Sequence, residues 1–333
     1  MTDPIAWIQE NLPLWETDAA TALYDRMESQ SGYQLPLINC PFDPAKRGHF
    51  MDRAQIIDFV LTAGPGRVLD FGPGDGWPSL LMAPMVDQVI GVDGSARRVK
   101  VCAENTRRLG IGNASFMHVQ PGEPLPFTDG FFDGITASSS FEQTPNPATT
   151  MGEMARVLKP GGRLRMHYES LSYYAGGCER ELKVIEFEPG TTDVLVFDRH
   201  LEEEYVCHYL LTLHGNRADI LALLGQPELS SLTLPVLADL QSRLQRAATW
   251  TTRHPACRTW LRLLADAGFA SARPTYDGGW FASRLFDILG ENRPQSVEDI
   301  DAMLHPLVQV VVTMESPCAA RSGEWEPWIT AER

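Results

Sequence analysis

Between residues 50 and 170, short apolar runs alternate with segments whose apolar positions recur at helical spacing. The runs are rich in β-branched and aromatic residues and predict strands, and the segments between them predict helices. The predicted strands are residues 67–71, 88–93, 114–120, 131–139 and 163–169. The predicted helices are residues 50–61, a segment from Pro78, a segment from a Ser95 cap to Leu109, and a segment from an Asn146 cap to the KPGG at 159–162. Strands that alternate with helices predict an α/β fold with a doubly wound parallel sheet.

The pattern changes after residue 170. Three strand-like runs separated by short turns predict a small antiparallel sheet at 182–188, 193–198 and 204–213. Two helices are expected near 217–224 and 234–249, and the earlier pattern returns with an amphipathic helix at 256–269. The last strands of the first sheet are expected at 271–276 and 306–315, with helical material at 278–304.

These patterns divide the chain into four regions. We expect a helical segment (18–29) and a lid-like loop (33–49) in region 1–49, and the main sheet in 50–170. An inserted region follows at 171–250, with a role in substrate specificity or oligomerisation, and 251–333 completes the main sheet.

The sequence RVLDFGPGDGWPSL (67–80) places a glycine-rich turn between a strand and a helix. Glycine allows the backbone to approach a ligand closely, and a helix N-terminus favours anionic or polar groups. Asp93 ends the next strand, where a carboxylate can accept the ribose hydroxyls of an adenosine, although an Asp there can also cap the following helix. The glycines follow G-x-G-x-G, whereas a dinucleotide site requires G-x-G-x-x-G.

Composition narrows the classes of partner. The 333 residues are 44% hydrophobic and carry a formal net charge of −15, which disfavours binding to nucleic acid or to an anionic membrane surface. Six scattered cysteines without a C-x-x-C pair fit a reducing cytoplasm better than a disulfide framework. The acidic, proline-broken N-terminus predicts no signal peptide, and no apolar run is long enough to cross a bilayer.

Four motifs occur in a fixed order: VLDFGPGDGWPSL, VIGVDGS, LPFTDGFFDGI and EMARVLKPGGRL. With this set the chain resembles the class I S-adenosylmethionine-dependent methyltransferases, closely over residues 50–170 and loosely over 256–315. The resemblance implies a Rossmann-like sheet that is mostly parallel with an antiparallel last strand. It also implies S-adenosyl-L-methionine as cofactor.

Carried over to this sequence, the resemblance implies a set of cofactor contacts. Asp70 and the backbone at Gly72 and Gly74 would border the methionine part, and Asp93 would hold the ribose. Gly94 or Ser95 would lie beside the adenine. The stretch from Ser138 to Ser140 would face the methionine end and the substrate, with an ordinary polar turn as the alternative. Many members have an acidic residue near the adenine amino group; here Pro121 falls at that position, and Gln120 or Glu123 could serve instead.

Candidates for a general base or a substrate contact lie near the ends of the fourth and fifth strands. Glu142 follows the fourth strand, and His167 and Tyr168 end the fifth, where open α/β sheets place their ligands. Strand side chains alternate between faces, so at most one of His167 and Tyr168 should face the pocket. A structural role is the alternative for each of the three. The methyl donor is already activated, so alignment and water exclusion carry much of the chemistry.

The sequence therefore predicts a cytoplasmic enzyme that transfers a methyl group to a small molecule, without a metal site, and a homodimer is compatible with it. The signature N/D-P-P-Y/F of enzymes that methylate base amines is absent, because the fourth strand leads into SSSFEQ. Three alternatives remain: a NAD-dependent oxidoreductase, an enzyme that uses the same cofactor for other chemistry, and a noncatalytic cofactor-binding subunit.

Overall fold

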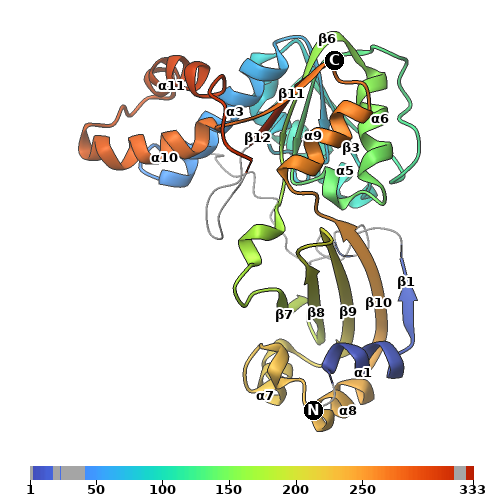
Figure 1. Ribbon diagram of the computed structural model, residues 1–333. Helices are drawn as coiled ribbons and strands as arrows, with labels where there is room; N and C mark the ends of the chain where they lie inside the picture. The colour runs from blue at the N-terminus through green and yellow to red at the C-terminus, as the bar shows by residue number, and fades with distance from the viewer. Residues whose placement is uncertain (1–2, 18–22, 24–41, 319–327) are drawn as a thin grey trace.

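The computed structural model describes residues 3–17, 23, 42–318 and 328–333. Its strands form a seven-stranded sheet and a five-stranded sheet, which lie one above the other in Figure 1. The predicted helix at 18–29 and the loop at 33–41 fall outside the described residues, Leu23 excepted. Residues 42–46 are loop, as predicted, but residues 47–49 of the predicted loop belong to helix α3 (Arg47–Ala63), which therefore begins before the predicted start at residue 50.

The seven-stranded sheet confirms the predicted doubly wound α/β class. Its order is β11-β12-β6-β5-β2-β3-β4, and only β12 is antiparallel to its neighbours. The strands are β2 (Arg67–Phe71), β3 (Gln88–Asp93), β4 (Ala114–His118), β5 (Phe132–Ser138), β6 (Leu158–His167), β11 (Ser271–Thr275) and β12 (Trp328–Glu332). The sheet order changes direction at β2, so the C-terminal ends of β2, β3 and β5 meet where such folds bind ligands.

Local sequence signals place the helices of this sheet. Ser95 caps α5 (Ala96–Leu109) by accepting from the backbone nitrogen of Arg98, and Gly110 ends it in the left-handed conformation. Asn146 caps α6 (Pro147–Val157) by accepting from Ala148 and Thr149. Other helices of this part are α3 (Arg47–Ala63), α4 (Ser79–Met82), α9 (Cys257–Asp266) and the 3-10 turns η1 (Ala83–Met85) and η2 (Phe141–Gln143). The KPGG sequence, expected to end the helix before the strand, instead belongs to β6, which is longer than predicted.

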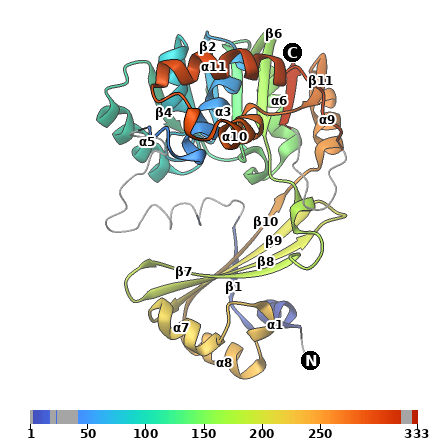
Figure 2. The same ribbon diagram turned by 90° about the vertical axis from the view of Figure 1, so that its left-hand side faces the viewer.

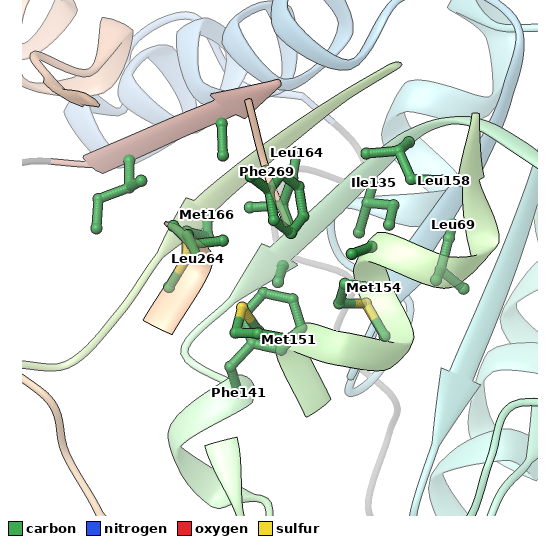
Figure 3. Packing of buried hydrophobic residues seen from close by; sticks show 14 of the residues in the cluster. Leu69, Ile135, Phe141, Met151, Met154, Leu158, Leu164, Met166, Leu264 and Phe269 are labelled. Carbon is green, nitrogen blue, oxygen red and sulfur yellow. The ribbon is translucent and has the colours of Figure 1, made fainter. Parts of the chain in front are cut away.

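Apolar side chains cover both faces of the sheet. On one face, residues of α6 and α9 such as Met151, Met154 and Leu264 pack against Leu69 and Ile135 (Figure 3). On the other face, α3 and the α4–η1 segment pack against the same strands. A fully buried ion pair joins α3 to β6, because both oxygens of Asp58 accept from the Arg165 guanidinium at 2.7 Å. The sheet that carries the ligand edge is therefore held rigidly from both sides.

The prediction of a last strand at 306–315 is wrong. Residues 297–311 form helix α11 (Val297–Val311), with Pro306 inside it, and the last strand is β12. Ile300, Leu304 and Val308 recur at helical spacing and pack against α3 together with helix α10 (Gly278–Leu289), which η5 (Gly290–Asn292) follows. This burial overrides the strand preference of the β-branched run.

The five-stranded sheet has the order β1-β10-β9-β8-β7 and is antiparallel except for the β1–β10 pair. Its strands are β1 (Leu14–Glu16), β7 (Arg180–Glu188), β8 (Thr191–His200), β9 (Tyr205–His214) and β10 (Leu244–Arg253). One face is covered by α1 (Pro4–Asn11), α7 (Arg217–Leu224) and α8 (Leu234–Ser242), as Figure 2 shows. Two 3-10 turns, η3 (Leu171–Tyr174) and η4 (Leu229–Ser231), complete this part.

Three expectations for this part need correction. The helix predicted at 234–249 ends at Ser242, and β10 follows, because its residues from 248 to 253 alternate between buried and more exposed positions. The N-terminal segment is not separate from the inserted region, since β1 pairs with β10. Cys257 and Cys318 form a disulfide, whereas the scattered cysteines were expected to remain unpaired. The domain boundaries at 49, 170 and 250 and the cytoplasmic location stay predictions.

Candidate functional site

A cavity of about 390 Å³ opens at the C-terminal ends of β2, β3 and β5. Its size lies within the usual range for small-molecule and cofactor sites. Its walls come from the glycine turn after β2, the end of β3, the loop after β4, the end of β5 and the first turns of α6. Of the cofactor residues predicted from the sequence, those that line the cavity are Gly72, Gly74, Asp93, Gly94, Ser95, Gln120 and Ser138.

The glycine turn needs glycine for its backbone shape and for space. Gly72 has φ +74° and Gly74 has φ +60°, a region that favours glycine. A side chain at Gly72 would also collide with Ser140, whose Oγ donates to the backbone oxygen of Phe71 at 2.6 Å. The Gly72 nitrogen donates to the oxygen of Val92 at 2.8 Å, which holds the turn beside β3. The turn therefore exposes backbone directly to the cavity.

Asp93 joins the turn to the following helix. Its Oδ1 accepts from the backbone nitrogen of Ser95 at 2.8 Å, and its Oδ2 lies 3.4 Å from the nitrogen of Gly74, which donates to it. The helix cap itself is Ser95, so capping of α5 does not explain Asp93. The carboxylate lines the cavity, in a position to accept hydrogen bonds from a ligand.

Asp70 is completely buried and does not line the cavity, unlike the other predicted cofactor residues. Ser79 donates to Oδ2, and Thr136 Oγ1 lies 3.4 Å from Oδ1. Burial raises the pKa of Asp70 to about 7, against the opposing effect of these hydrogen bonds. Through its hydrogen bond with Ser79, Asp70 therefore joins the end of β2 to the start of α4 and stabilises the glycine turn between them.

None of the three candidates for catalysis lines the cavity, although Glu142 adjoins Gln143 and His167 contacts Ser139, which both do. Glu142 is fully buried; its Oε1 accepts from the Glu169 nitrogen at 3.0 Å, its Oε2 has no hydrogen-bond partner, and burial raises its pKa to about 8. His167 Nδ1 lies 2.9 Å from Ser139 Oγ, and burial lowers its pKa to about 4. Tyr168 is fully buried beside Trp260, so only His167 of the two neighbours is directed toward the site.

Sequence reasoning did not single out Ser139 as a partner of His167. Ser139 lines the cavity, has φ +49°, and its nitrogen donates to the His167 oxygen at 3.0 Å. The register between β5 and β6, which places Ser138 opposite His167, brings the two together. Other lining residues that sequence reasoning missed are Asp75, Trp77, Arg98, Gln143, Thr149 and Glu153. These residues lie on helices and turns, and the periodicity of the sequence alone does not show which of their side chains point into the cavity.

Within the part of the chain that the structure describes, no group of three His, Cys, Asp or Glu side chains could hold a metal ion. No helix among those residues has the length and apolar character needed to cross a membrane.

Comparison with known proteins agrees with this location. Residues 69–166 match the model of a family described as a methyltransferase domain. Over 104 residues the chain is 36% identical to the uncharacterized methyltransferase YcgJ of Bacillus subtilis. The match covers 31% of this chain and 41% of that protein. Over 114 residues it is 30% identical to a demethylmenaquinone methyltransferase of Thermus thermophilus, covering 34% of this chain and 51% of that protein. The chain spans about half the length of these curated relatives.

Among solved structures, an S-adenosylmethionine-dependent methyltransferase from Clostridium acetobutylicum is 11% identical. The superposition covers 89% of this chain and 93% of that one, with a TM-score of 0.46.

Proposed function

We propose, from the premise that residues 69–166 are a class I S-adenosylmethionine-dependent methyltransferase domain, that the whole chain transfers a methyl group to a small-molecule acceptor. The observation that carries the proposal is the joint placement of the glycine turn and Asp93 on one cavity at the sheet edge. Relatives named as methyltransferases match the same part of the chain.

The residues around the cavity fit this cofactor. Asp93 offers carboxylate oxygens to the ribose hydroxyls, and the positive-φ turn at Gly72 and Gly74 leaves space for the methionine part. Gln120 offers an amide to the adenine, at the edge where Pro121 supplies no side-chain acceptor. When bound, S-adenosylmethionine supplies a methyl group on a positively charged sulfur. Asp75, Asp93, Glu123 and Glu153 line the cavity together with a single arginine, Arg98, so acidic side chains outnumber basic ones there and favour that positive charge.

The protein's own part in the reaction is to orient the acceptor. Ser139 Oγ faces the cavity and contacts the His167 imidazole, which is neutral at pH 7 because its pKa is lowered to about 4. We assign His167 as a residue that orients Ser139 toward a hydroxyl or amine of the acceptor. Glu142 is protonated at neutral pH and positions the segment after β6 through its bond to Glu169. A catalytic role of Tyr168 has least support, because its ring is enclosed in the core.

The acceptor is proposed to be a small molecule. One relative is named for methylation of demethylmenaquinone, and the net charge of −15 disfavours nucleic acid. We propose that region 171–250 determines which acceptor is bound, since it supplies most of the five-stranded sheet, which lies outside the matched residues 69–166. A homodimer stays a prediction that light scattering on the purified chain tests.

The direct test is to incubate the protein with S-adenosylmethionine and a panel of hydroxyl, amine, thiol and carbon acceptors. Formation of S-adenosylhomocysteine together with an acceptor heavier by one CH₂ group supports methyl transfer. Cofactor binding without either product across the panel would favour the noncatalytic alternative. Consumption of the cofactor with other products would favour different chemistry on the same scaffold.

A further inference from the structure

The segment that follows β5 forms one wall of the cavity. Residues 138–140, 143 and 144 line the cavity, whereas residues 141 and 142 do not. Ser140 fixes this wall against the glycine turn, because its Oγ donates to the Phe71 oxygen at 2.6 Å and its side chain fills the space beside Gly72. The wall therefore lies directly beside the turn that is proposed to hold the methionine part of the cofactor.

The turn η2 within this wall is held firmly from the side of the core. Phe141 is fully buried among core side chains (Figure 3). Glu142 is also fully buried, and its Oε1 accepts from the Glu169 nitrogen at 3.0 Å. The Thr144 hydroxyl donates to the Phe141 oxygen at 2.7 Å and accepts from Thr150 Oγ1 at 3.0 Å. These contacts leave the backbone of the turn little freedom to move.

Gln143 carries the polar side chain of this turn that is directed to the cavity without a partner. Its backbone nitrogen donates to the Ser140 oxygen at 3.1 Å. Its side chain lines the cavity and is partly exposed, and among the described residues none hydrogen-bonds to its amide group. An amide carries a carbonyl acceptor and an N–H₂ donor side by side. A firmly held turn thus offers one donor and one acceptor to a ligand in the cavity.

Gln143 lies on the side of the cavity away from the proposed adenosine contacts. Asp93 ends β3 and Gln120 follows β4. Ser139 and Gln143 follow β5, which β2 separates from β3 in the sheet. On the same side, Ser139 Oγ lies 2.9 Å from His167 Nδ1 and adds a hydroxyl to the wall. A methyl acceptor has to approach the methionine end of the cofactor, so both side chains stand where it would bind.

The charge of the cavity narrows the class of acceptor. Four carboxylates and one guanidinium line the cavity, and a further arginine pairs with one of the carboxylates. This excess of negative charge disfavours an acceptor that binds as a carboxylate or a phosphate. Phe71 and Trp77 also line the cavity and supply aromatic surface for a ring.

We propose that Gln143 is a specificity residue for the methyl acceptor, and that its amide pairs with an uncharged group that carries a hydrogen-bond donor and an acceptor side by side. An amide is such a group, and so is a hydroxyl next to a carbonyl. A carboxylate in the same place would set one of its oxygens against the Gln143 carbonyl oxygen, which has no proton to donate. The inference deepens the proposed function and rests on it.

The test compares benzamide with benzoate, two probes of nearly the same shape that differ in charge and in the N–H₂ donor. Binding is measured by NMR titration of the full chain saturated with S-adenosylhomocysteine at pH 7. We expect benzamide to bind about tenfold more tightly than benzoate, and Gln143→Leu to weaken benzamide binding about tenfold, because two hydrogen bonds are lost. Benzoate binding as tight as that of benzamide, or unchanged benzamide binding in Gln143→Leu, would overturn the proposal.

Gln120→Leu is the matched control, because it makes the same substitution on the adenosine side of the cavity. It should weaken the binding of S-adenosylhomocysteine and, once that ligand is saturating, keep the preference for benzamide. The opposite pattern would also overturn the proposal, with Gln143→Leu losing S-adenosylhomocysteine and Gln120→Leu losing the benzamide preference. If Gln143→Leu does not fold, Gln143→Glu is the second variant and should shift binding about tenfold from benzamide toward the cation benzamidine.

Titration of the wild type with S-adenosylhomocysteine alone tests the proposed function separately. Absence of that binding would count against the cofactor site itself. Binding of S-adenosylhomocysteine without a benzamide preference would count against the role of Gln143 alone.

Discussion

Asp93 Oδ1 accepts a hydrogen bond from the backbone nitrogen of Ser95 at 2.8 Å. Ser95 in turn caps α5 with its own hydroxyl, so the helix does not need the Asp93 side chain as its cap. The second oxygen of Asp93 extends toward the glycine turn, where Gly74 lies 3.4 Å away. The carboxylate therefore stands between two backbone elements on a cavity wall, which gives it a geometry suited to ligand binding.

Replacing Asp93 should weaken binding of the cofactor. We expect Asp93→Ala to raise the dissociation constant for S-adenosylhomocysteine about tenfold or more, because charge-assisted hydrogen bonds are lost. Asp93→Asn keeps an acceptor for Ser95 and should isolate the effect of charge. Calorimetry measures both, with the exposed Asp87→Asn as control. An unchanged affinity in Asp93→Ala would show that Asp93 does not hold the ribose.

Gly72 should not tolerate alanine. The substitution combines a positive φ, which costs about 1–2 kcal/mol for other residues, with a collision against Ser140. Gly190 has a similar φ of +78° but open space around it, so Gly190→Ala reports the conformational cost alone. Urea unfolding should show a clearly larger loss for Gly72→Ala than for Gly190→Ala. Equal losses would mean that the contact with Ser140 relaxes freely.

Glu142 should make stability depend on pH. Its pKa rises from an ordinary 4.5 to about 8 in the folded state, so the folded protein retains a proton that the unfolded chain releases. Its contribution is complete below about pH 4.5 and is lost as the pH rises through 8. Glu142→Gln has no carboxyl group to ionise. Relative to the wild type, its free energy of unfolding should therefore rise with pH, by on the order of 2 kcal/mol or more at pH 9.

The measurement is urea unfolding of both proteins at pH 5, 7 and 9. The exposed Glu10→Gln serves as control and should follow the wild type throughout. A constant difference between Glu142→Gln and the wild type across this range would contradict the raised pKa.

Removing the charge of one partner of the Asp58–Arg165 ion pair should lower the free energy of unfolding strongly. Both side chains are fully buried, and Asp58→Asn leaves the guanidinium without its counter-charge. We expect a loss of about 3–5 kcal/mol in unfolding free energy, with much of it recovered in the double variant Asp58→Leu, Arg165→Met. The half-exposed pair of Arg47 and Asp287 is the control, since Arg47→Met should cost less than about 1 kcal/mol. Similar losses for Asp58→Asn and Arg47→Met would contradict this.

Local signals in the sequence were sufficient for the central sheet. The strands at 67–71 and 88–93 have the predicted bounds, and the Ser95 and Asn146 caps are formed as expected. These features depend on contacts between near neighbours in the chain. The strand prediction for 306–315 is wrong because its β-branched residues are buried against α3 and α10. That tertiary contact is not encoded in the intrinsic preference of the residues. The Cys257–Cys318 pair likewise joins residues 61 apart, without a local signature.

The sequence alone predicted the parts of the candidate site that depend on local backbone conformation. Glycines that require positive φ and an Asp at a strand end are visible in the sequence, and all but Asp70 of the predicted cofactor residues reach the cavity. The pairing of Ser139 with His167 depends on the register between β5 and β6. Such registers follow from long-range packing, so the sequence alone could not reveal them.

The most direct test of the cofactor assignment, on which the whole account depends, is calorimetric titration of the full chain with S-adenosylmethionine, S-adenosylhomocysteine and NAD. We predict micromolar binding of both sulfur compounds and no heat with NAD, because the glycine turn follows G-x-G-x-G and not the G-x-G-x-x-G of a dinucleotide site. Binding of NAD alone would contradict the cofactor assignment and favour an oxidoreductase. Binding of none of the three would contradict a functional cofactor site.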